Sequence, residues 1–311
     1  MMAGKQYKIA IIGGGAVGLV FAALLSEVAD VLVVTRRAEQ AEHINSQGIS
    51  FRRKTGQERT FKGERTFKKV RASTDYADLK DCDAIIVAVK SFDTAAVARA
   101  MNRVIRPEAV VVSVQNGLEG YPVLGEHIDN PGRVFDGVTY LGAERSDDRS
   151  VTNGDNQKVV LDSAAAELAE VMARSELEVV ASPNAKQAVW DKMALSTAQN
   201  ALSAVMNLNM GQMLESEEAL RRASMLMGEF EDVAAAEGVT FDYSLMDALR
   251  GNWKNSTFFP SMWQDLHAGR RTEIDAINGA VSTLGRKHGI ATPYNDEIVA
   301  QVRALEKASK S

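Results

Sequence analysis

Cysteine and histidine are scarce in this sequence, which has one cysteine, Cys82, and four scattered histidines among 311 residues. A single cysteine excludes a disulfide framework and is typical of a protein kept in a reducing cytoplasm. The scattered histidines lack the spacing of a zinc site, and we expect no metal. No apolar run reaches membrane-spanning length without glycine or charge. We therefore expect a soluble, cytoplasmic protein with no membrane partner.

Positive charge is also in deficit, because 36 Lys and Arg face 41 Asp and Glu and give a net charge of −5 at pH 7. Such a balance argues against a surface that binds duplex nucleic acid, and we expect no nucleic-acid partner. One local exception is the segment Arg52–Arg71, with nine basic residues and a near-duplicated ERTFK at positions 58–62 and 64–68. Its alternating pattern predicts a short solvated hairpin, and a polyanion-binding patch is the alternative.

Length and composition favour two globular domains. The chain is 45% hydrophobic and 25% charged, values typical of globular proteins, and 311 residues are too many for one small core. Strand-like and helix-like patterns alternate up to Ser182, whereas from Asn184 onward the pattern is almost entirely helical. We predict an α/β architecture in which a Rossmann-type, doubly wound sheet domain (residues 1–182) precedes an all-helical domain (residues 183–311).

The N-terminus carries a glycine-rich turn in the setting that dinucleotide binding requires. Lys8–Ile12 is a β-type run, and an apolar helical pattern extends from Ala16 to about Val28. Glycines at this spacing allow a tight turn, the approach of a pyrophosphate to backbone N–H groups, and close packing of helix on strand. The predicted cofactor-binding turn consists of Gly13, Gly14, Gly15, Ala16, Val17 and Gly18.

The next predicted strand, Val31–Val34, leads into Thr35, Arg36 and Arg37. An NAD-binding domain usually has an acid here that holds the ribose 2′-hydroxyl, and no acid is present. Guanidinium groups suit a 2′-phosphate, so we predict NADP(H) as the cofactor. The alternative is that both arginines are ordinary solvated loop charges.

Two further buried-strand patterns, Ala84–Val89 and Ala109–Val114, end next to Lys90 and Asn116. Ligands of parallel sheets bind beyond the carboxyl ends of the strands, so both side chains are candidates for the site. The alternative is that Lys90 only ends a strand and that Asn116, followed by glycine, only forms a turn.

The segment Trp190–Asn207 predicts a mostly apolar helix with one narrow polar stripe. A helix that is apolar over most of its surface is usually buried, so the stripe should face a cleft or another element. Lys192 is therefore a candidate for chemistry, and a lysine that snorkels to the surface is the alternative. The stripe consists of Lys192, Ser196, Gln199, Asn200, Ser203 and Asn207.

A second helical pattern, Thr272–Lys287, places Glu273 on the same face as Ile277, Val281 and other apolar residues. Carboxylates are seldom buried without a partner, and Glu273 and Lys192 are candidates for each other. A buried ion pair that only joins two helices is the alternative.

With these residues, the whole chain resembles the ketopantoate reductase (2-dehydropantoate 2-reductase) family. The most specific match is PSMWQDLHAGRRTEIDAINGA at residues 260–280. The others are the N-terminal GGGAVG, VAVK ending at Lys90, QNG at Asn116, and WDKMA around Lys192.

The resemblance implies NADPH-dependent reduction of a small-molecule 2-oxo acid, with ketopantoate giving pantoate on the route to pantothenate. Lys192 matches the lysine that donates the proton, and Glu273 matches the glutamate that keeps that lysine charged and oriented. Lys90 and Asn116 match positions lining both nicotinamide and substrate, while Asn200 and Ser261 match substrate contacts. The substrate set is then Lys90, Asn116, Lys192, Ser196, Asn200 and Ser261, and the resemblance leaves a homodimer open.

Two departures from the family pattern concern the pocket wall. Ser196 stands where the family commonly has asparagine, and Phe258 lies near Ser261 where a polar residue is common. Both departures keep open the alternative that the protein is a related reductase of another branched 2-oxo acid.

A non-catalytic NADP-binding regulator is a further alternative. His267 could serve as the acid instead of Lys192, but its polar surroundings favour a solvated histidine.

Overall fold

The chain forms two compact units, and the computed structural model describes residues 6–55 and 60–309. Unit 1 comprises residues 1–115 and 120–186, and unit 2 comprises residues 116–119 and 187–311. The predicted fold class is confirmed: unit 1 is built on a largely parallel sheet, and the described part of unit 2 is helical. The predicted domain bounds, 1–182 and 183–311, stay a prediction.

Unit 1 contains an eight-stranded sheet with the order β12-β11-β8-β7-β6-β1-β2-β5. Neighbouring strands are parallel except β8 and β11, which pair antiparallel. The order reverses beside β1, because the chain first extends the sheet through β2 and β5 and then through β6 and β7. The strands are β1 (Lys8–Ile12), β2 (Asp30–Val34), β5 (Val70–Ser73), β6 (Ala84–Val87), β7 (Val110–Ser113), β8 (Val134–Thr139), β11 (Lys158–Asp162) and β12 (Glu178–Ser182).

Alternation along the central strands explains why both faces of this sheet are covered. In β1, Ile9 and Ile11 enter one hydrophobic cluster, while Ala10 and Ile12 enter the other. Successive side chains of a strand point to opposite faces, so a strand that is apolar throughout needs helices on both sides. The helices of unit 1 are α1 (Ala16–Leu25), α2 (Ala38–Gln47), α3 (Thr94–Asn102), α4 (Gly120–His127) and α5 (Ala166–Met172).

Helix α1 ends at Leu25, three residues before the predicted end at Val28. The Ser26 hydroxyl donates to the carbonyl of Ala23 at 2.7 Å, a local bond that competes with the helical pattern. The chain then turns into β2, where the amide of Asp30 donates to Tyr7 at 2.9 Å. Pairing of β2 with β1 therefore stops the helix.

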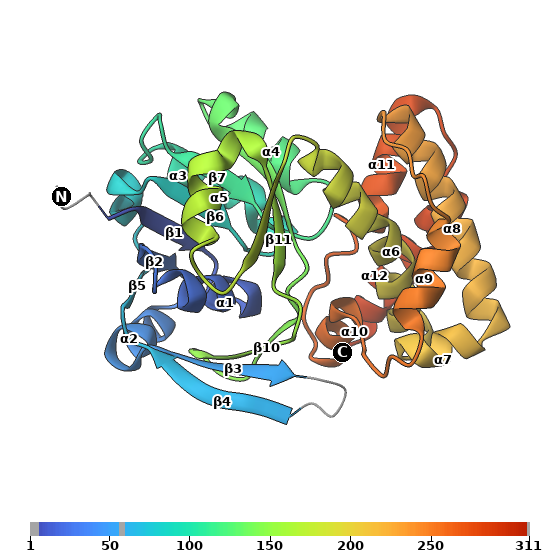
Figure 1. The fold of residues 1–311 in the computed structure, drawn as a ribbon. Coiled ribbons are helices and arrows are strands. Elements are labelled where there is room, and N and C mark those ends of the chain that lie inside the picture. The colour runs from blue at the N-terminus through green and yellow to red at the C-terminus, as the bar shows by residue number, and fades with distance from the viewer. Residues whose placement is uncertain (1–5, 56–59, 310–311) are drawn as a thin grey trace. The chain divides into compact units, whose positions relative to one another are not determined.

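A second sheet, with the order β4-β3-β10-β9, also belongs to unit 1. Helix α1 contacts both sheets and lies between them (Figure 1). The predicted hairpin is confirmed, because β3 and β4 pair antiparallel; residues 58–59 of the first ERTFK copy lie outside the described residues. Several of its basic side chains contact acids, such as Arg52 with Glu64 at 2.7 Å. The strands are β3 (Ile49–Thr55), β4 (Thr60–Phe67), β9 (Ala143–Arg145) and β10 (Ser150–Asn153).

Unit 2 packs its helices around one apolar cluster that includes Leu202, Phe230, Trp253 and Val281. The predicted helix Trp190–Asn207 is confirmed as the greater part of α6. Among the described residues, no helix combines the length and apolarity needed to cross a membrane. The helices are α6 (Ala185–Met206), α7 (Met210–Glu215), α8 (Glu217–Ala236), α9 (Leu245–Trp253), α10 (Ser261–His267), α11 (Asn278–His288) and α12 (Pro293–Ala308).

The predicted start of the next helix at Thr272 is wrong, since α11 begins at Asn278. Residues 273–277 form a turn, in which Ile277 has a non-helical backbone (φ −96°, ψ −92°). The carbonyl of Ala276 accepts a bond from the amide of Leu118 at 3.2 Å, so a distant segment binds the backbone there. Glu273 is buried as predicted, but on a turn and not on a helical face.

Candidate active site

The glycine-rich turn lies between the carboxyl end of β1 and the N-terminus of α1. The amide of Gly13 donates to the carbonyl of Val34 at 2.9 Å, which ties the turn to the end of β2. A Cβ on Gly18 would lie 1.9 Å from the carbonyl oxygen of Gly13, so only glycine allows this packing. A Cβ on Gly15 would meet nothing within 4 Å. The turn therefore offers open space beside the positive end of a helix, which suits a pyrophosphate.

Both predicted arginines follow β2, and each lies beside a carboxylate. Arg36 is 85% exposed, and its guanidinium is 3.5 Å from Asp93. Arg37 occupies the N-cap position of α2 and forms an ion pair with Asp148. Anions that bind beyond this strand would meet two guanidinium groups and two carboxylates.

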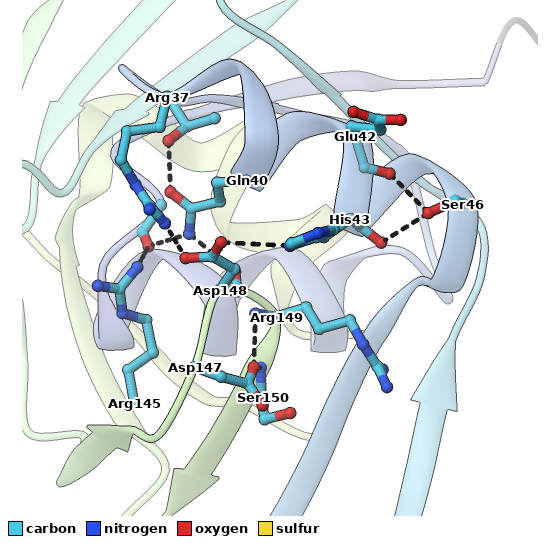
Figure 2. Close-up of polar contacts among 12 residues, drawn as sticks. Arg37, Gln40, Glu42, His43, Ser46, Arg145, Asp147, Asp148, Arg149 and Ser150 are labelled. Atoms are coloured by element: carbon cyan, nitrogen blue, oxygen red, sulfur yellow. Dashed lines mark hydrogen bonds and ion pairs between the residues drawn. The ribbon is translucent and has the colours of Figure 1, made fainter.

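Sequence reasoning missed three residues that hold this region together, namely Gln40, Arg145 and Asp148. The Gln40 side chain donates to the carbonyl oxygens of Gly14 and Asp148, both at 2.8 Å. Arg145 also donates to the carbonyl of Gly14, at 3.1 Å. Figure 2 shows Gln40 beside Asp148, and both Arg37 and Arg145 to the left of Asp148 in this view. Asp148 lies more than 100 positions after Gln40 in the chain. Pairing of strands in the second sheet brings the β9–β10 segment to this region.

Lys90 and Gln115 follow β6 and β7, the two strands beside β1 in the sheet. Lys90 precedes a single 3₁₀ turn, Ser91–Asp93, as its N-cap residue. The side-chain nitrogen Nε2 of Gln115 donates to the carbonyl of Val89 at 2.9 Å and to the Thr94 hydroxyl at 2.7 Å. These bonds hold the two strand ends together, and Asn116 then begins the segment that belongs to unit 2.

Within unit 2, Lys192 and Asn116 are in direct contact. Nζ of Lys192, a partly buried residue on α6, donates to Oδ1 of Asn116 at 2.7 Å. Gly117 follows with φ +100°, and a Cβ there would lie 2.5 Å from the carbonyl oxygen of Ala276. Only glycine adopts this conformation at such a close approach without strain, which explains the Asn-Gly pair of the sequence.

The electrostatic setting of Lys192 suits proton donation. Burial lowers the pKa of Lys192 to about 8, and the negative charge of Glu273 opposes this shift. Burial disfavours the ammonium, whereas a nearby carboxylate favours it. A pKa close to the working pH leaves the group largely protonated near neutrality and still able to release its proton.

A buried network fixes the turn that carries Glu273. The Asn278 side chain donates to the carbonyl of Thr197 on α6 and to Oδ1 of Asn295, both at 2.9 Å. Asn295 in turn donates to Glu229 at 2.7 Å, and both asparagines are fully buried. Buried polar groups need partners, so this network holds the start of α11 against α6. The sequence carries the asparagines but no signal that pairs them.

The predicted substrate residues of unit 2 lie along α6 and at the start of α10. Ser196 and Asn200 are buried, one and two helical turns beyond Lys192. The Ser261 hydroxyl lies 3.4 Å from Oδ1 of Asn200 and donates to it. The structure therefore brings Asn200 and Ser261 together, as it does Asn116 and Lys192.

His267 lies at the far end of α10 and is exposed. Its ring stacks on Trp263, with centroids 3.6 Å apart, and Nδ1 lies 3.0 Å from the Trp263 carbonyl.

Residues 6–55 and 60–309 contain no group of three or more His, Cys, Asp or Glu that could hold a metal ion.

Comparison with known proteins covers both units. Residues 9–166 match the family described as ketopantoate reductase PanE/ApbA, and residues 184–306 match its C-terminal domain. The 2-dehydropantoate 2-reductase of Halobacterium salinarum is 28% identical over 96% of this chain and 99% of its own.

Two solved structures share the fold closely. A PanE/ApbA family ketopantoate reductase from Ralstonia eutropha superimposes with a TM-score of 0.89 at 30% identity, over 98% of this chain and 100% of its own. D-mandelate dehydrogenase with NADH and anilino(oxo)acetate gives a TM-score of 0.87 at 26% identity, with the same coverage. The fold and its relatives define an oxidoreductase with a Rossmann-like domain. The chain belongs to the ketopantoate reductase PanE/ApbA family.

Proposed function

We propose that the protein reduces 2-dehydropantoate (ketopantoate) to pantoate with NADPH, a step of pantothenate biosynthesis. The observation that carries the proposal is the contact of Lys192 with Asn116, beside the charge of Glu273, in a chain that matches the reductase family in both units. A cytoplasmic location belongs to the same proposal and is supported by the single cysteine.

Lys192 is the proton donor of the proposed reaction. When bound, the nicotinamide supplies the hydride that attacks the carbonyl carbon, and Lys192 gives its proton to the carbonyl oxygen. Asn116 orients the ammonium through its 2.7 Å bond. Glu273 stabilises the charged form of the lysine against burial. A neutral lysine cannot protonate the oxygen, so Glu273, which raises the pKa of Lys192 against burial, determines the fraction of the protein that carries the active ammonium.

The substrate carboxylate is assigned to the Asn200 and Ser261 side chains, with Ser196 in the wall beside them. A serine hydroxyl donates one hydrogen bond, and an asparagine amide donates two, which suits a carboxylate. Ser261 lies at the first position of α10, where the helix leaves backbone N–H groups without helical partners. Lys90, a residue of unit 1, is assigned to the nicotinamide and substrate.

The glycine-rich turn and the residues after β2 fit a dinucleotide. The open space at Gly15 and the N-terminus of α1 support binding of the pyrophosphate. Arg36 and Arg37 follow β2, and no acid stands there that could bind the ribose 2′-hydroxyl. These two residues support NADP(H) over NAD(H). The assigned cofactor residues are Gly13, Gly14, Gly15, Ala16, Val17, Gly18, Arg36, Arg37, Lys90 and Asn116.

The test is a steady-state panel of 2-oxo acids, each measured with NADPH and with NADH. We expect 2-dehydropantoate to be among the best substrates by kcat/KM, and NADPH to have the lower KM. Good turnover of other 2-oxo acids together with poor turnover of 2-dehydropantoate would reject this substrate.

A 2-oxo acid with a bulkier apolar side chain is the second candidate. Phe258, 41% exposed, lies three residues before Ser261, and Phe259 stacks on Trp263 with centroids 4.0 Å apart. These rings place apolar surface close to the assigned carboxylate contact. The similarity to D-mandelate dehydrogenase points the same way, because that structure holds an aryl-substituted oxo acid. Phenylglyoxylate in the same panel distinguishes the two candidates.

A further inference from the structure

Asp148 lies where it competes with a phosphate for Arg37. Its carboxylate forms the ion pair with Arg37 and lies 3.2 Å from Nδ1 of His43. Figure 2 shows this carboxylate between the Arg37 guanidinium and the His43 ring. The Asp148 side chain is only 21% exposed, whereas that of Arg37 is 52% exposed. The carboxylate is therefore held in place, while part of the guanidinium faces solvent.

Hydrogen bonds brace the backbone that carries Asp148. Gln40 donates to the Asp148 carbonyl at 2.8 Å from α2, the helix that begins after Arg37. The preceding residue, Asp147, closes a tight turn by accepting from the amides of Arg149 and Ser150 at 2.9 and 2.7 Å. The carboxylate that contacts Arg37 therefore extends from a braced turn.

We propose that Asp148 is a specificity-determining residue that narrows the preference of this protein for NADPH over NADH. This inference rests on the proposed function, in which Arg36 and Arg37 bind the 2′-phosphate. A phosphate that binds Arg37 must displace the Asp148 carboxylate or lie beside its negative charge. NADH has a hydroxyl at that position, so its binding requires neither displacement of the carboxylate nor a phosphate beside its negative charge. Specificity is a difference of two affinities, and here the repulsive element acts only on NADPH.

The opposing charge at Arg36 is different in kind. Arg36 lies 3.5 Å from Asp93, a long contact, and its side chain is 85% exposed. An exposed arginine can turn toward a phosphate at little cost, because surface ion pairs contribute little. Arg36 therefore maintains a basal preference for NADPH over NADH. The Arg37–Asp148 pair determines how much stronger than this basal level the preference becomes.

The experiment measures the Kd of NADPH and of NADH for the full chain by nicotinamide fluorescence, without a 2-oxo acid, at one ionic strength. We expect Asp148→Asn to bind NADPH about tenfold more tightly and NADH within about twofold of the parent, since charge-assisted bonds to phosphate are the stronger kind. Asp148→Ser, which shortens the side chain, should shift the ratio in the same direction.

Asp147→Asn is the matched control, because it removes the same charge one residue away and keeps an oxygen that can close the turn. Its NADPH to NADH ratio should equal that of the parent. In Arg37→Gln, adding Asp148→Asn should bring no gain for NADPH, since the effect requires the guanidinium.

Two results would overturn the inference while the proposed function stands. One is tight binding of both dinucleotides with an unchanged ratio in Asp148→Asn and Asp148→Ser. The other is a gain that persists without Arg37. Failure of the parent chain to bind either dinucleotide would reject the proposed function and this inference together.

Discussion

Oδ1 of Asn116 accepts a hydrogen bond from Nζ of Lys192 at 2.7 Å, although the two residues are 76 positions apart. An amide oxygen orients an ammonium without adding a full negative charge, whereas the charge near this lysine comes from Glu273. Orientation and charge are thus supplied by different residues. This separation allows each contribution to be tested by its own substitution.

Replacing the proposed proton donor should abolish most turnover and leave cofactor binding intact. We expect Lys192→Gln to lower kcat by about 10²–10⁴-fold, the usual contribution of a positioned acid. NADPH affinity, measured by fluorescence, should stay close to that of the parent. Lys186→Gln is the control, because Lys186 is an exposed lysine on the same helix. A kcat near that of the parent in Lys192→Gln would remove Lys192 from the mechanism.

The pH dependence of the reduction should report the ammonium of Lys192. Its pKa is lowered to about 8, and the protonated form is the active one. The value of kcat/KM for the reduction should therefore be level below pH 7 and fall about tenfold per pH unit above pH 8, because kcat/KM reports the free enzyme. The reverse oxidation, which needs the neutral amine, should rise over the same range. A reduction rate that is level up to pH 10 would contradict the assignment.

Glu273→Gln should move this decline to lower pH. The negative charge of Glu273 raises the pKa of Lys192, so its removal lowers that pKa further. Asp275→Asn is the matched control, since Asp275 lies in the same turn but contacts Arg303 at 2.6 Å and Arg271 at 3.2 Å. Its pH profile should equal that of the parent. Identical profiles for Glu273→Gln and the parent would show that the carboxylate does not act on the lysine.

Gly117→Ala should damage both stability and catalysis. The new Cβ would lie 2.5 Å from the Ala276 carbonyl, at a φ of +100° that alanine adopts only with strain. We expect a loss of about 2–3 kcal/mol in the free energy of unfolding and a lower kcat, because Asn116 is displaced from Lys192. Gly125→Ala, in α4, is the control, since its Cβ would meet nothing within 4 Å. Denaturant unfolding and kcat of the two variants give the comparison.

Asp136 in β8 offers a test of stability outside the proposed chemistry. Burial, with the charge of Asp162, raises the pKa of Asp136 from 3.8 to about 6. The unfolded state therefore ionises first, and stability is lost as pH rises from about 4 to 6. Asp136→Asn should raise the free energy of unfolding by about 1–3 kcal/mol at pH 8 and by little near pH 4. An equal gain at both pH values would rule out this ionisation as the cause.

Local patterns identified most of the secondary structure. The run Lys8–Ile12 coincides with β1, and the helix predicted at Trp190–Asn207 lies almost entirely within α6. Apolar strands and a mostly apolar helix are set by short-range periodicity, so the sequence can reveal them. The strands β9 and β10 were not predicted, because they are short and have one partly exposed face.

By itself, the sequence determined the α/β class, the glycine-rich turn, and the candidacy of Lys192 and Glu273, because periodicity and residue chemistry are local properties. Only the tertiary structure decided which groups meet. It delayed the start of the predicted helix to Asn278, beyond Glu273, where the amide of Leu118 binds the carbonyl of Ala276. It also brought Asp148 to Arg37 through the pairing of β3 with β10. Contacts between distant segments depend on how elements pack, and no short stretch of sequence records that packing.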